Sequence, residues 1–502
     1  MKVTTEAVFH ATDVAPVLRP RDGLVLEAPA GDGAFTQQEG PFRHYRRTVT
    51  ARPTPGEPGV RVTQTVEFHL GLPYFSALLG LPLRWALGRL RPERHRPWWA
   101  PPERLDRRAA EVLATVCALA VVIGFVGSLL SLTMTYAAAE FGASRADQGV
   151  ALGAVRANVV LALGILALAD RRGRRRLILA CAGGAVGLTS LGALAPSLVW
   201  LALTQILAVA LTAALLILVG VMTAEEMPAG SRAWALAVLT MAVGFGGGLA
   251  TAALPVAGIG TRGWRWPYAG ALVFLPLVAS ARRHLPESWR WQRAFAAERP
   301  PAHRSHARRL LLLCTGGFLF SLFVTPSGQF QNEYLRTERA FSAARIAEFS
   351  LICGTIGGLG VLLGGRLADL RGRRLVAVVG AGGGIVTTLA LYLSRGWPLW
   401  AWGIADSLLA YGVAPALGVY GPELFPTWQR SRSTGVVAAA YAAGGVVGLV
   451  TAGALSGHFG TFAPAFAVLA IGPALLVVLI VTAYPETAKR PLEELNPDDS
   501  GP

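Results

Sequence analysis

The sequence is poor in charged residues and in cysteine. Of its 502 residues only 15% are charged, whereas 53% are hydrophobic, and the mean hydropathy is +0.46. Soluble proteins of this length do not have such a composition. The cysteines lie inside apolar runs without metal-like spacing, so we expect inert small hydrophobic residues at all four positions: Cys117, Cys181, Cys314 and Cys353.

Several functional motifs are also missing. The sequence has no nucleotide-binding loop of the Gly-x-x-x-x-Gly-Lys type, which argues against ATP-driven pumping. The histidines near the start of the chain are scattered without partners, so we expect no enzyme activity, no metal site and no cofactor. The first residues lack a short apolar core after a basic start, and no secretory signal peptide is expected.

Long apolar runs dominate the sequence from residue 111 onwards. They are separated by short polar breaks, and each is about 20 residues long, the length that a helix needs to cross a bilayer. We therefore expect twelve membrane-spanning helices. Their approximate ranges are 111–137, 146–169, 177–195, 198–222, 232–256, 265–281, 309–331, 343–367, 375–393, 398–421, 433–455 and 462–484.

Arginines are distributed unevenly between the loops. If the N-terminus is cytoplasmic, the inner loops hold the clusters 171–176, 282–309 and 371–374, and the outer loops hold fewer cations. Cations in short loops set orientation, so we expect a multi-pass protein of the cell (plasma) membrane with both termini cytoplasmic. Topology and attraction to anionic membrane lipids then explain the net charge of +16, and we expect no nucleic-acid partner.

The chain contains an internal repeat. The segment LADRRGRR at 168–175 recurs as LADLRGRR at 367–374, an offset of 199 residues (367 − 168). PESWR at 286–290 matches PETAKR at 485–490 with the same offset, and EEMPAGSR resembles PELFPTWQR. Three pairs in register indicate a duplication. Each copy would hold six spans, so the two copies enter the membrane from the same side.

These loop motifs resemble those of the major facilitator superfamily, over about residues 110–490, and most closely its sugar-porter and related metabolite-transporter branches. The resemblance implies an all-α membrane protein with twelve transmembrane helices in two six-helix pseudo-symmetric halves. To this we add a small N-terminal cytoplasmic α+β extension. The expected parts are the extension (1–105), the first half (106–281), a cytoplasmic linker (282–308), the second half (309–485) and a cytoplasmic tail (486–502).

The resemblance also implies that the repeated loops latch the cytoplasmic side when the transporter is open outwards. Asp170 and Asp369 sit where a helix leaves the bilayer, and such a carboxylate can face the positive end of a neighbouring helix or pair with arginines. Glycine allows the tight turn that follows. For the arginines, anchoring of the topology is an equally weighted interpretation. The expected latch residues of these loops are Asp170, Arg171, Gly173, Arg174, Asp369, Gly372 and Arg373.

A second repeated pattern, Glu-x-x-Pro-x-x-x-Arg, follows the fourth and tenth spans. It places Glu225 with Arg232 and Glu423 with Arg430, and we expect both pairs to join the latch. The alternative is two solvated surface pairs, each worth less than about 1 kcal/mol. The family motif has Gly four residues before its Asp, and this chain departs from it at Leu166, which puts close packing of the second span in doubt.

Polar residues inside the spans are the candidates for binding the solute or a coupling ion. Arg156 lies about 15 Å deep if its span begins near residue 146, so it either pairs with a carboxylate, binds an anionic group or snorkels outwards. Glu348 and Asp406 could carry a coupling proton, or could be solvated acids at the rim. From the cavity-lining spans that the resemblance implies we add Gln205, Gln329, Asn332 and Tyr411.

The first hundred residues are too long for a usual tail of the family. Partly alternating segments at 43–51 and 60–70 predict a β-hairpin, and the stretch 74–99 predicts an interfacial amphipathic helix on the inner leaflet. We expect a monomeric secondary active transporter that moves a small organic solute by alternating access, as a symporter or antiporter, with protons as one candidate coupling ion. The alternative is a transporter-derived receptor that signals through the N-terminal domain.

Overall fold

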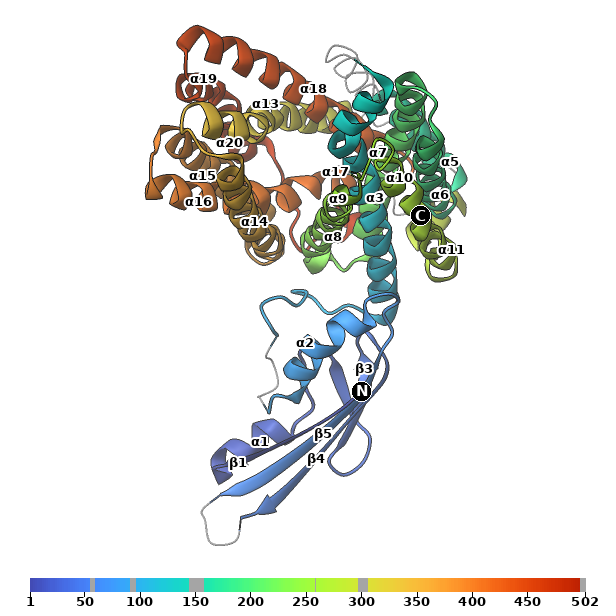
Figure 1. Ribbon diagram of the computed structural model, residues 1–502. Helices are drawn as coiled ribbons and strands as arrows, with labels where there is room; N and C mark the ends of the chain where they lie inside the picture. The colour runs from blue at the N-terminus through green and yellow to red at the C-terminus, as the bar shows by residue number, and fades with distance from the viewer. Residues whose placement is uncertain (55–58, 91–95, 144–157, 258, 297–305, 497–502) are drawn as a thin grey trace.

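The computed structural model describes residues 1–54, 59–90, 96–143, 158–257, 259–296 and 306–496. It contains an antiparallel sheet near the N-terminus and a large bundle of helices (Figure 1). The strand order in the sheet is β1-β5-β4-β3-β2. The strands are β1 (Lys2–Phe9), β2 (Leu26–Pro29), β3 (Ala34–Glu39), β4 (Phe42–Pro53) and β5 (Val60–Leu70).

The sheet is covered on one face by two short helices, α1 (Ala11–Leu18) and α2 (Ser76–Gly88). Strand side chains alternate between the faces, and in β5 every second residue from Val62 to Phe68 is buried. The residues between them, such as Thr63 and Thr65, point to the open face. The N-terminal extension thus contains a β-sheet, as expected, and β4 pairs with β5 in antiparallel register.

The bundle is formed by the rest of the chain. The helices between residues 107 and 284, the first group, are α3 (Arg107–Phe141), α5 (Asn158–Arg172), α6 (Arg174–Leu191), α7 (Leu198–Glu226), α8 (Arg232–Ala252), α9 (Leu254–Ala257), α10 (Arg265–Gly270) and α11 (Leu275–His284). Those between 307 and 483, the second group, are α13 (Ala307–Thr337), α14 (Ala343–Arg371), α15 (Arg373–Leu393), α16 (Trp397–Gly418), α17 (Tyr420–Leu424), α18 (Arg430–Phe459), α19 (Phe462–Leu469) and α20 (Ile471–Ala483). The short helices α12 (Trp289–Ala296) and α21 (Leu492–Leu495) follow the two groups.

Among the described residues, ten helices are long and apolar enough to cross a membrane. Two of the twelve expected spans are not among them. The span at 146–169 is described only from residue 158 onwards. The span at 265–281 consists of α10, a short 3-10 turn and α11, each of which is shorter than a bilayer crossing.

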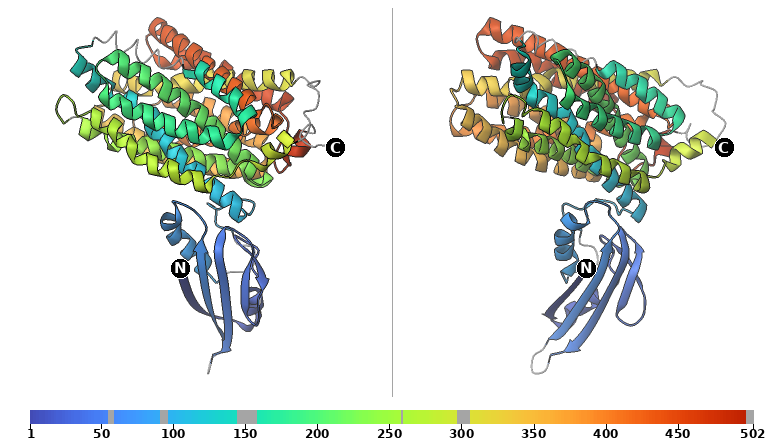
Figure 2. Two further views of the ribbon diagram at one scale, coloured as in Figure 1. Left: turned by 90° about the vertical axis from the view of Figure 1, so that its right-hand side faces the viewer. Right: turned by 45° about the vertical axis from the view of Figure 1, so that its right-hand side comes forward.

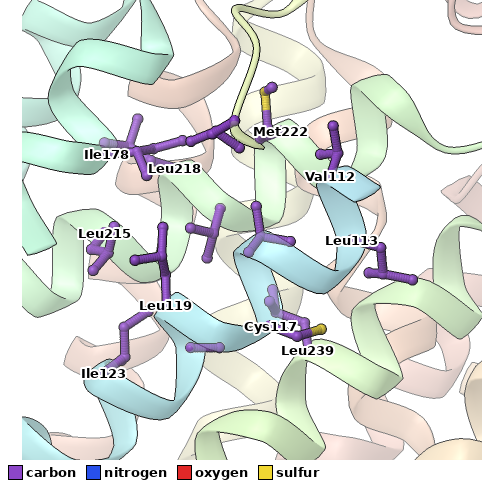
Figure 3. Packing of buried hydrophobic residues seen from close by; sticks show 14 of the residues in the cluster. Val112, Leu113, Cys117, Leu119, Ile123, Ile178, Leu215, Leu218, Met222 and Leu239 are labelled. Carbon is purple, nitrogen blue, oxygen red and sulfur yellow. The ribbon is translucent and has the colours of Figure 1, made fainter. Parts of the chain in front are cut away.

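Buried apolar side chains fill the interior of the first group in two clusters. Figure 3 shows Val112 and Leu119 of α3 packed with Ile178 of α6 and with Leu215 and Leu218 of α7. Because these side chains are short and branched or small, the helices come close enough to fill the space between them. Helix α3 begins at Asp106, whose side chain accepts a hydrogen bond from the amide of Ala109 (2.7 Å).

Glycines allow the closest approaches between helices. A Cβ atom at Gly246 of α8 would collide with the carbonyl oxygen of Val121 in α3, and one at Gly444 of α18 would collide with that of Phe318 in α13. Both residues lie in Gly-rich runs of the sequence, so these runs mark close contacts between helices. Gly246 and Gly444 are 198 residues apart (444 − 246), so the repeated sequence makes the same contact twice.

The two groups meet mainly at the proximal end of the bundle, where α3 begins. There α8 packs against α14, and α5 packs against α18. In both views of Figure 2 the sheet lies to one side of the bundle and joins it at the start of α3. The proximal end therefore brings together the sheet, the repeated loops and both groups of helices.

Candidate functional site

Buried charged side chains form a cluster at the proximal end, between the two groups of helices. We call it the charge cluster. Its members come from both copies of the repeat and are at most 1% exposed: Arg174, Glu225, Arg232, Asp369, Arg373, Glu423 and Arg430. All seven are residues that the sequence suggested as a latch. The alternative of solvated surface pairs does not describe them, because they are shielded from water.

Glu225 at the end of α7 lies at the centre of the first half of this cluster. One carboxylate oxygen pairs with Arg174 of the first group, and the other pairs with Arg430 of the second group. The hydroxyl of Ser288 also donates to Glu225 (2.6 Å). Arg174 in turn donates to the carbonyl of Thr427 in the second group (2.8 Å). Glu225 therefore joins cations from both groups.

Glu423 of α17 makes the corresponding arrangement in the second half. Its Oε1 atom pairs with Arg373 of its own group (3.1 Å) and with Arg232 of the first group (3.3 Å). Arg373 also donates to the carbonyl of Ala229 (3.2 Å) in the first group. Since buried charges are costly unless they are paired, this geometry holds the groups together only while the pairs stay intact.

Asp369 at the end of α14 adds a contact to a helix terminus. Its carboxylate accepts hydrogen bonds from the amides of Ala233 (3.3 Å) and Trp234 (2.8 Å) and pairs with Arg373 (3.0 Å). Both amides belong to the first turn of α8, where the helix dipole favours a negative charge. This is the placement that the sequence suggested for the acid. The side chains of Asp170 and Arg171 lie outside the described residues.

The two turns that carry the repeated loops depend on glycine. Gly173 has φ +95° and Gly372 has φ +110°, in the region that other residues rarely adopt. A Cβ at Gly173 would lie 2.7 Å from a carboxylate oxygen of Glu287, and one at Gly372 would lie 2.6 Å from that of Glu486. Glycine thus provides both the turn and the space for these carboxylates.

Glu287 and Glu486 are site residues that the sequence reasoning missed. Glu287 accepts hydrogen bonds from the first amides of α6 (Arg174, 3.0 Å), and Glu486 accepts from those of α15 (Arg373, 3.0 Å). They belong to the repeated Pro-Glu-Ser and Pro-Glu-Thr motifs, so the repeat was a signal that could have identified them. Their carboxylates fix the backbones from which the cluster arginines project.

Close packing at Leu166, which the sequence put in doubt, is achieved in another way. Leu166 of α5 is fully buried, and a Cβ at Gly435 of α18 would lie 2.5 Å from its Cδ1 atom. In the other junction the small residue is on α14, because a Cβ at Gly365 would lie 2.6 Å from the carbonyl oxygen of Ala233 and 2.7 Å from Cβ of Ala237. Gly435 therefore makes room for Leu166.

The candidate substrate residues are dispersed, and Arg156 lies outside the described residues. Gln205 is fully buried within the first group, beside Gly192. Three other candidates are exposed: Gln329 and Asn332 on α13 and Glu348 on α14. Tyr411 is half exposed, and its ring lies over Gly357 of α14.

Asp406 of α16 is a candidate solute or coupling-ion residue with defined polar partners inside the bundle. Its Oδ1 atom accepts hydrogen bonds from the hydroxyls of Thr387 (2.9 Å) and Thr388 (2.6 Å) of α15. With Thr388 and Ser327 it lines a small cavity of about 20 Å³, which has room for about one water molecule. The acid therefore lies between helices of the second group rather than on an open rim.

The linker before α3 also contacts both groups, which the sequence did not suggest. The carbonyl of Trp99 accepts a hydrogen bond from Trp234 Nε1 of α8 (3.1 Å), and that of Ala100 accepts from Arg366 of α14. The carboxylate of Glu103 accepts from the amide of Gly230 (2.6 Å). The linker 96–105 thus lies across the junction of α8 and α14.

Comparisons with known proteins agree with this architecture. The segments 116–414 and 313–499 match the family model of the Major Facilitator Superfamily. No curated protein matches the sequence. Among solved structures, the proton:xylose symporter XylE bound to 6-bromo-6-deoxy-D-glucose has a TM-score of 0.67 at 17% identity, covering 78% of this chain and 98% of that one.

Two further structures share the fold. FucP, an E. coli fucose:proton symporter solved in the outward conformation, has a TM-score of 0.63 at 13% identity, covering 75% of this chain and 99% of that one. The human organic anion transporter MFSD10 has a TM-score of 0.60 at 16% identity, covering 76% and 100%. The family match extends over most of the chain, and we conclude that this multi-pass membrane protein belongs to the major facilitator superfamily of transporters.

Proposed function

We propose that the protein is a secondary active transporter that moves a small organic solute by alternating access. The observation that carries the proposal is the charge cluster, in which Glu225 and Glu423 each bind one arginine from each group of helices. The two groups would be six-helix halves of a twelve-helix bundle. The proximal end would face the cytoplasm and would be closed in this conformation.

The charge cluster suits a joint that must open and close. When the groups separate, the charges gain water as a new partner, so the loss of the ion pairs is largely offset by hydration. An apolar junction of the same area would have no such compensation, because opening it exposes hydrophobic surface. The closed and open states can therefore have similar free energies, as alternating access requires.

For the solute we keep the candidates from the sequence. Arg156 would bind an anionic group of the solute, and Gln205, Gln329, Asn332 and Tyr411 would supply neutral polar contacts. Asp406 or Glu348 would carry a coupling proton. XylE and FucP are described as proton symporters of sugars and MFSD10 as an organic anion transporter, so sugars and organic anions are the first classes to test.

The experiment is a ligand screen followed by flux. Purified protein is tested by thermal shift against sugars, organic acids, aromatic acids and organic cations, because a ligand that binds only the native state raises the apparent melting temperature. The stabilising compound is then supplied in labelled form to proteoliposomes with and without a pH gradient. We expect accumulation driven by the gradient. Binding without any net flux would contradict the proposal.

That contrary outcome would support the second candidate, a receptor that signals through the N-terminal domain. The observation in its favour is the linker 96–105, which touches Trp234 of α8 and Arg366 of α14 and continues from the sheet. Arg104 of this linker pairs with Asp22 of the sheet domain (3.2 Å). A rearrangement of the junction would therefore reach the sheet. A receptor would bind the solute, change this contact and leave the solute on one side.

A further inference from the structure

Helix α2 has apolar side chains on two faces, and only one face is covered. Leu83 and Leu87 are buried against the sheet. On the opposite side Leu78 is 71% exposed, Leu81 is 74% exposed and Trp85 is 58% exposed. The spacing of three and four residues places these three side chains in one stripe along the helix. In water such a stripe is unfavourable, since each side chain leaves apolar surface hydrated.

The covered face of α2 is fixed, so the helix cannot turn the stripe inwards. Arg21 donates hydrogen bonds to the carbonyls of Leu87 (2.9 Å) and Arg89 (2.8 Å), and Gln64 Nε2 donates to that of Leu87 (3.1 Å). Gln64 is fully buried. These bonds satisfy carbonyl groups at the C-terminal end of α2 and tie them to the sheet. The outward direction of Leu81 and its neighbours is therefore built into the domain.

The segments that flank α2 on both sides contact the bundle. Before the helix, the ring of Tyr74 contacts that of His284 at the end of α11 (centroids 5.9 Å apart). After it, Trp99 is hydrogen-bonded to Trp234 in the first turn of α8. Helices α8 and α11 belong to a membrane-embedded bundle, and these are their proximal ends. Helix α2 (Figure 1) is thus tethered near the proximal ends of α8 and α11. The ends of membrane-spanning helices lie at the level of the lipid headgroups, so this is where we expect α2.

The chemistry of the exposed stripe fits that depth. The guanidinium of Arg89 lies over the ring of Trp85, with 3.1 Å between Cζ and the ring centroid, and Arg84 projects from the same helix. A tryptophan beside arginines is typical of the interface, where the ring lies among the headgroups and the cations meet phosphates. The open face of the sheet differs, because it carries polar residues such as Thr50 and Thr63.

We propose that the stripe Leu78–Leu81–Trp85 of α2 inserts into the adjacent lipid leaflet and that Arg84 and Arg89 bind anionic headgroups. The N-terminal sheet is then a membrane-associated domain with a fixed orientation on the bilayer. The proposal rests on insertion of the bundle into a membrane and not on solute transport. That the leaflet is the cytoplasmic one follows only from the proposed orientation of the bundle.

The test uses the full-length protein in nanodiscs with an environment-sensitive fluorophore on Leu81→Cys. The four native cysteines are first replaced by Ala or Ser, and this background must keep its melting temperature. In nanodiscs made of equal parts phosphatidylcholine and phosphatidylglycerol we expect blue-shifted emission and strong quenching by lipids brominated along the acyl chain. The control is the same fluorophore on Thr50→Cys, on the open face of the sheet. Quenching at residue 81 should exceed the control at least about twofold.

Two further measurements separate lipid from other occupants. Replacing phosphatidylglycerol by phosphatidylcholine should weaken the quenching, and so should Arg84→Gln combined with Arg89→Gln, because both remove charge attraction. Equal quenching at residues 81 and 50 would overturn the proposal. A blue shift that persists in detergent at high protein concentration, together with a doubled mass, would show instead that a second copy covers the stripe. Neither result depends on flux.

Discussion

The two junctions between the helix groups are built from equivalent parts of the repeat but are packed differently. At the junction of α5 and α18 the large residue is Leu166 and the glycine is Gly435. At the junction of α14 and α8 the glycine is Gly365, and it faces Ala237. Position 365 corresponds to 166 and position 435 to 237 by the offsets of 199 and 198. The two copies of the repeat thus have different residues at both positions of this contact, yet the helices touch in both junctions.

The second junction also carries more polar contacts. Asp369 binds the first turn of α8 there, and the linker 96–105 crosses the same place through Trp99 and Ala100. The first junction relies on a side chain filling a gap, whereas the second brings backbone close to backbone. We infer that the junction of α14 and α8 holds the two groups together at the proximal end more strongly than the junction of α5 and α18 does.

The largest effect is expected for Asp369→Asn. The substitution removes the charge that binds Arg373 and the first turn of α8, and it leaves the buried Arg373 with only one of its two acidic partners, Glu423. Breaking a buried pair in this way costs about 3 kcal/mol of unfolding free energy. Melting temperature and flux in proteoliposomes should both fall. The matched control is Arg176→Ala in the first turn of α6, where the side chain is exposed; it should change stability by less than about 0.5 kcal/mol. Equal small effects would leave the loops only a topological role.

The next effect concerns the glycines. Gly365→Ala should destabilise the closed junction by about 2 kcal/mol, because the new methyl group meets the backbone carbonyl of Ala233 and the helices must separate. Gly435→Ala should cost less than half as much, since it meets the end of the Leu166 side chain, which can change rotamer. The measurement is the melting temperature of each variant and the reactivity of a cysteine placed at the proximal end of α14.

A double substitution checks the physical reason. Leu166→Ala creates a cavity and should destabilise alone, but combined with Gly435→Ala it should lose less than the sum of the two single effects, because the added methyl group fills part of the gap. Additive costs would mean that Leu166 and Gly435 do not adapt to each other. The large residue at 166 and the glycine at 435 would then contribute independently to stability, and packing would not explain the difference between the junctions.

A smaller effect is expected at the linker. Glu103→Ala removes the hydrogen bond to the amide of Gly230, and this partly buried contact should be worth about 1 kcal/mol. We expect faster labelling of a cysteine at the proximal end of α14 with little change in melting temperature. The control is Glu39→Ala, which removes one of the two acidic partners of Arg104 on the sheet side (3.7 Å) and should leave the labelling rate unchanged. Equal rates for both variants would show that the linker does not hold the junction.

Much of the fold could be predicted from the sequence, because a bilayer imposes helix length and apolarity. The repeat even indicated which residues occupy equivalent places. The sheet was predicted only in part. Strands β4 and β5 alternate clearly, but β1 (Lys2–Phe9) carries threonines on both faces and is only half covered, so its pattern is weak. The short β2 and β3 give no sequence signal of their own without their neighbours.

The site was predicted as a set of residues but not as a set of pairs. Spacing indicated that Glu225 and Arg430 matter, yet they are 205 residues apart, and their contact depends on how the groups pack. The capping role of Glu287 depends on where the chain returns after α11, which no local pattern contains. The deepest cation, Arg156, remains a prediction, and its test is the affinity of Arg156→Lys for the solute.

The smallest effect is a pH dependence that distinguishes the two segments that follow the helix groups and begin at residues 286 and 485. Arg290, which follows the first group, pairs with Glu493, which follows the second group (2.8 Å). Its counterpart Arg490 pairs with Glu494, four residues along the same segment (3.8 Å). Burial acts to raise the pKa of Glu493, but the hydrogen bond and charge of Arg290, together with a backbone hydrogen bond and the charge of Arg232, outweigh it and hold that pKa below its ordinary value. A lowered folded-state pKa contributes stability above the unfolded-state pKa of about 4.3, and this contribution disappears as pH falls through the folded-state value.

Arg290→Gln should therefore lower the free energy of unfolding at neutral pH by less than about 1 kcal/mol, which would appear as a slightly lower melting temperature. The difference from the unmodified protein should vanish in acid. Arg490→Gln should show no such pH-dependent difference. A difference for Arg290→Gln that is the same at neutral and acid pH would show that its guanidinium packs without stabilising the Glu493 charge.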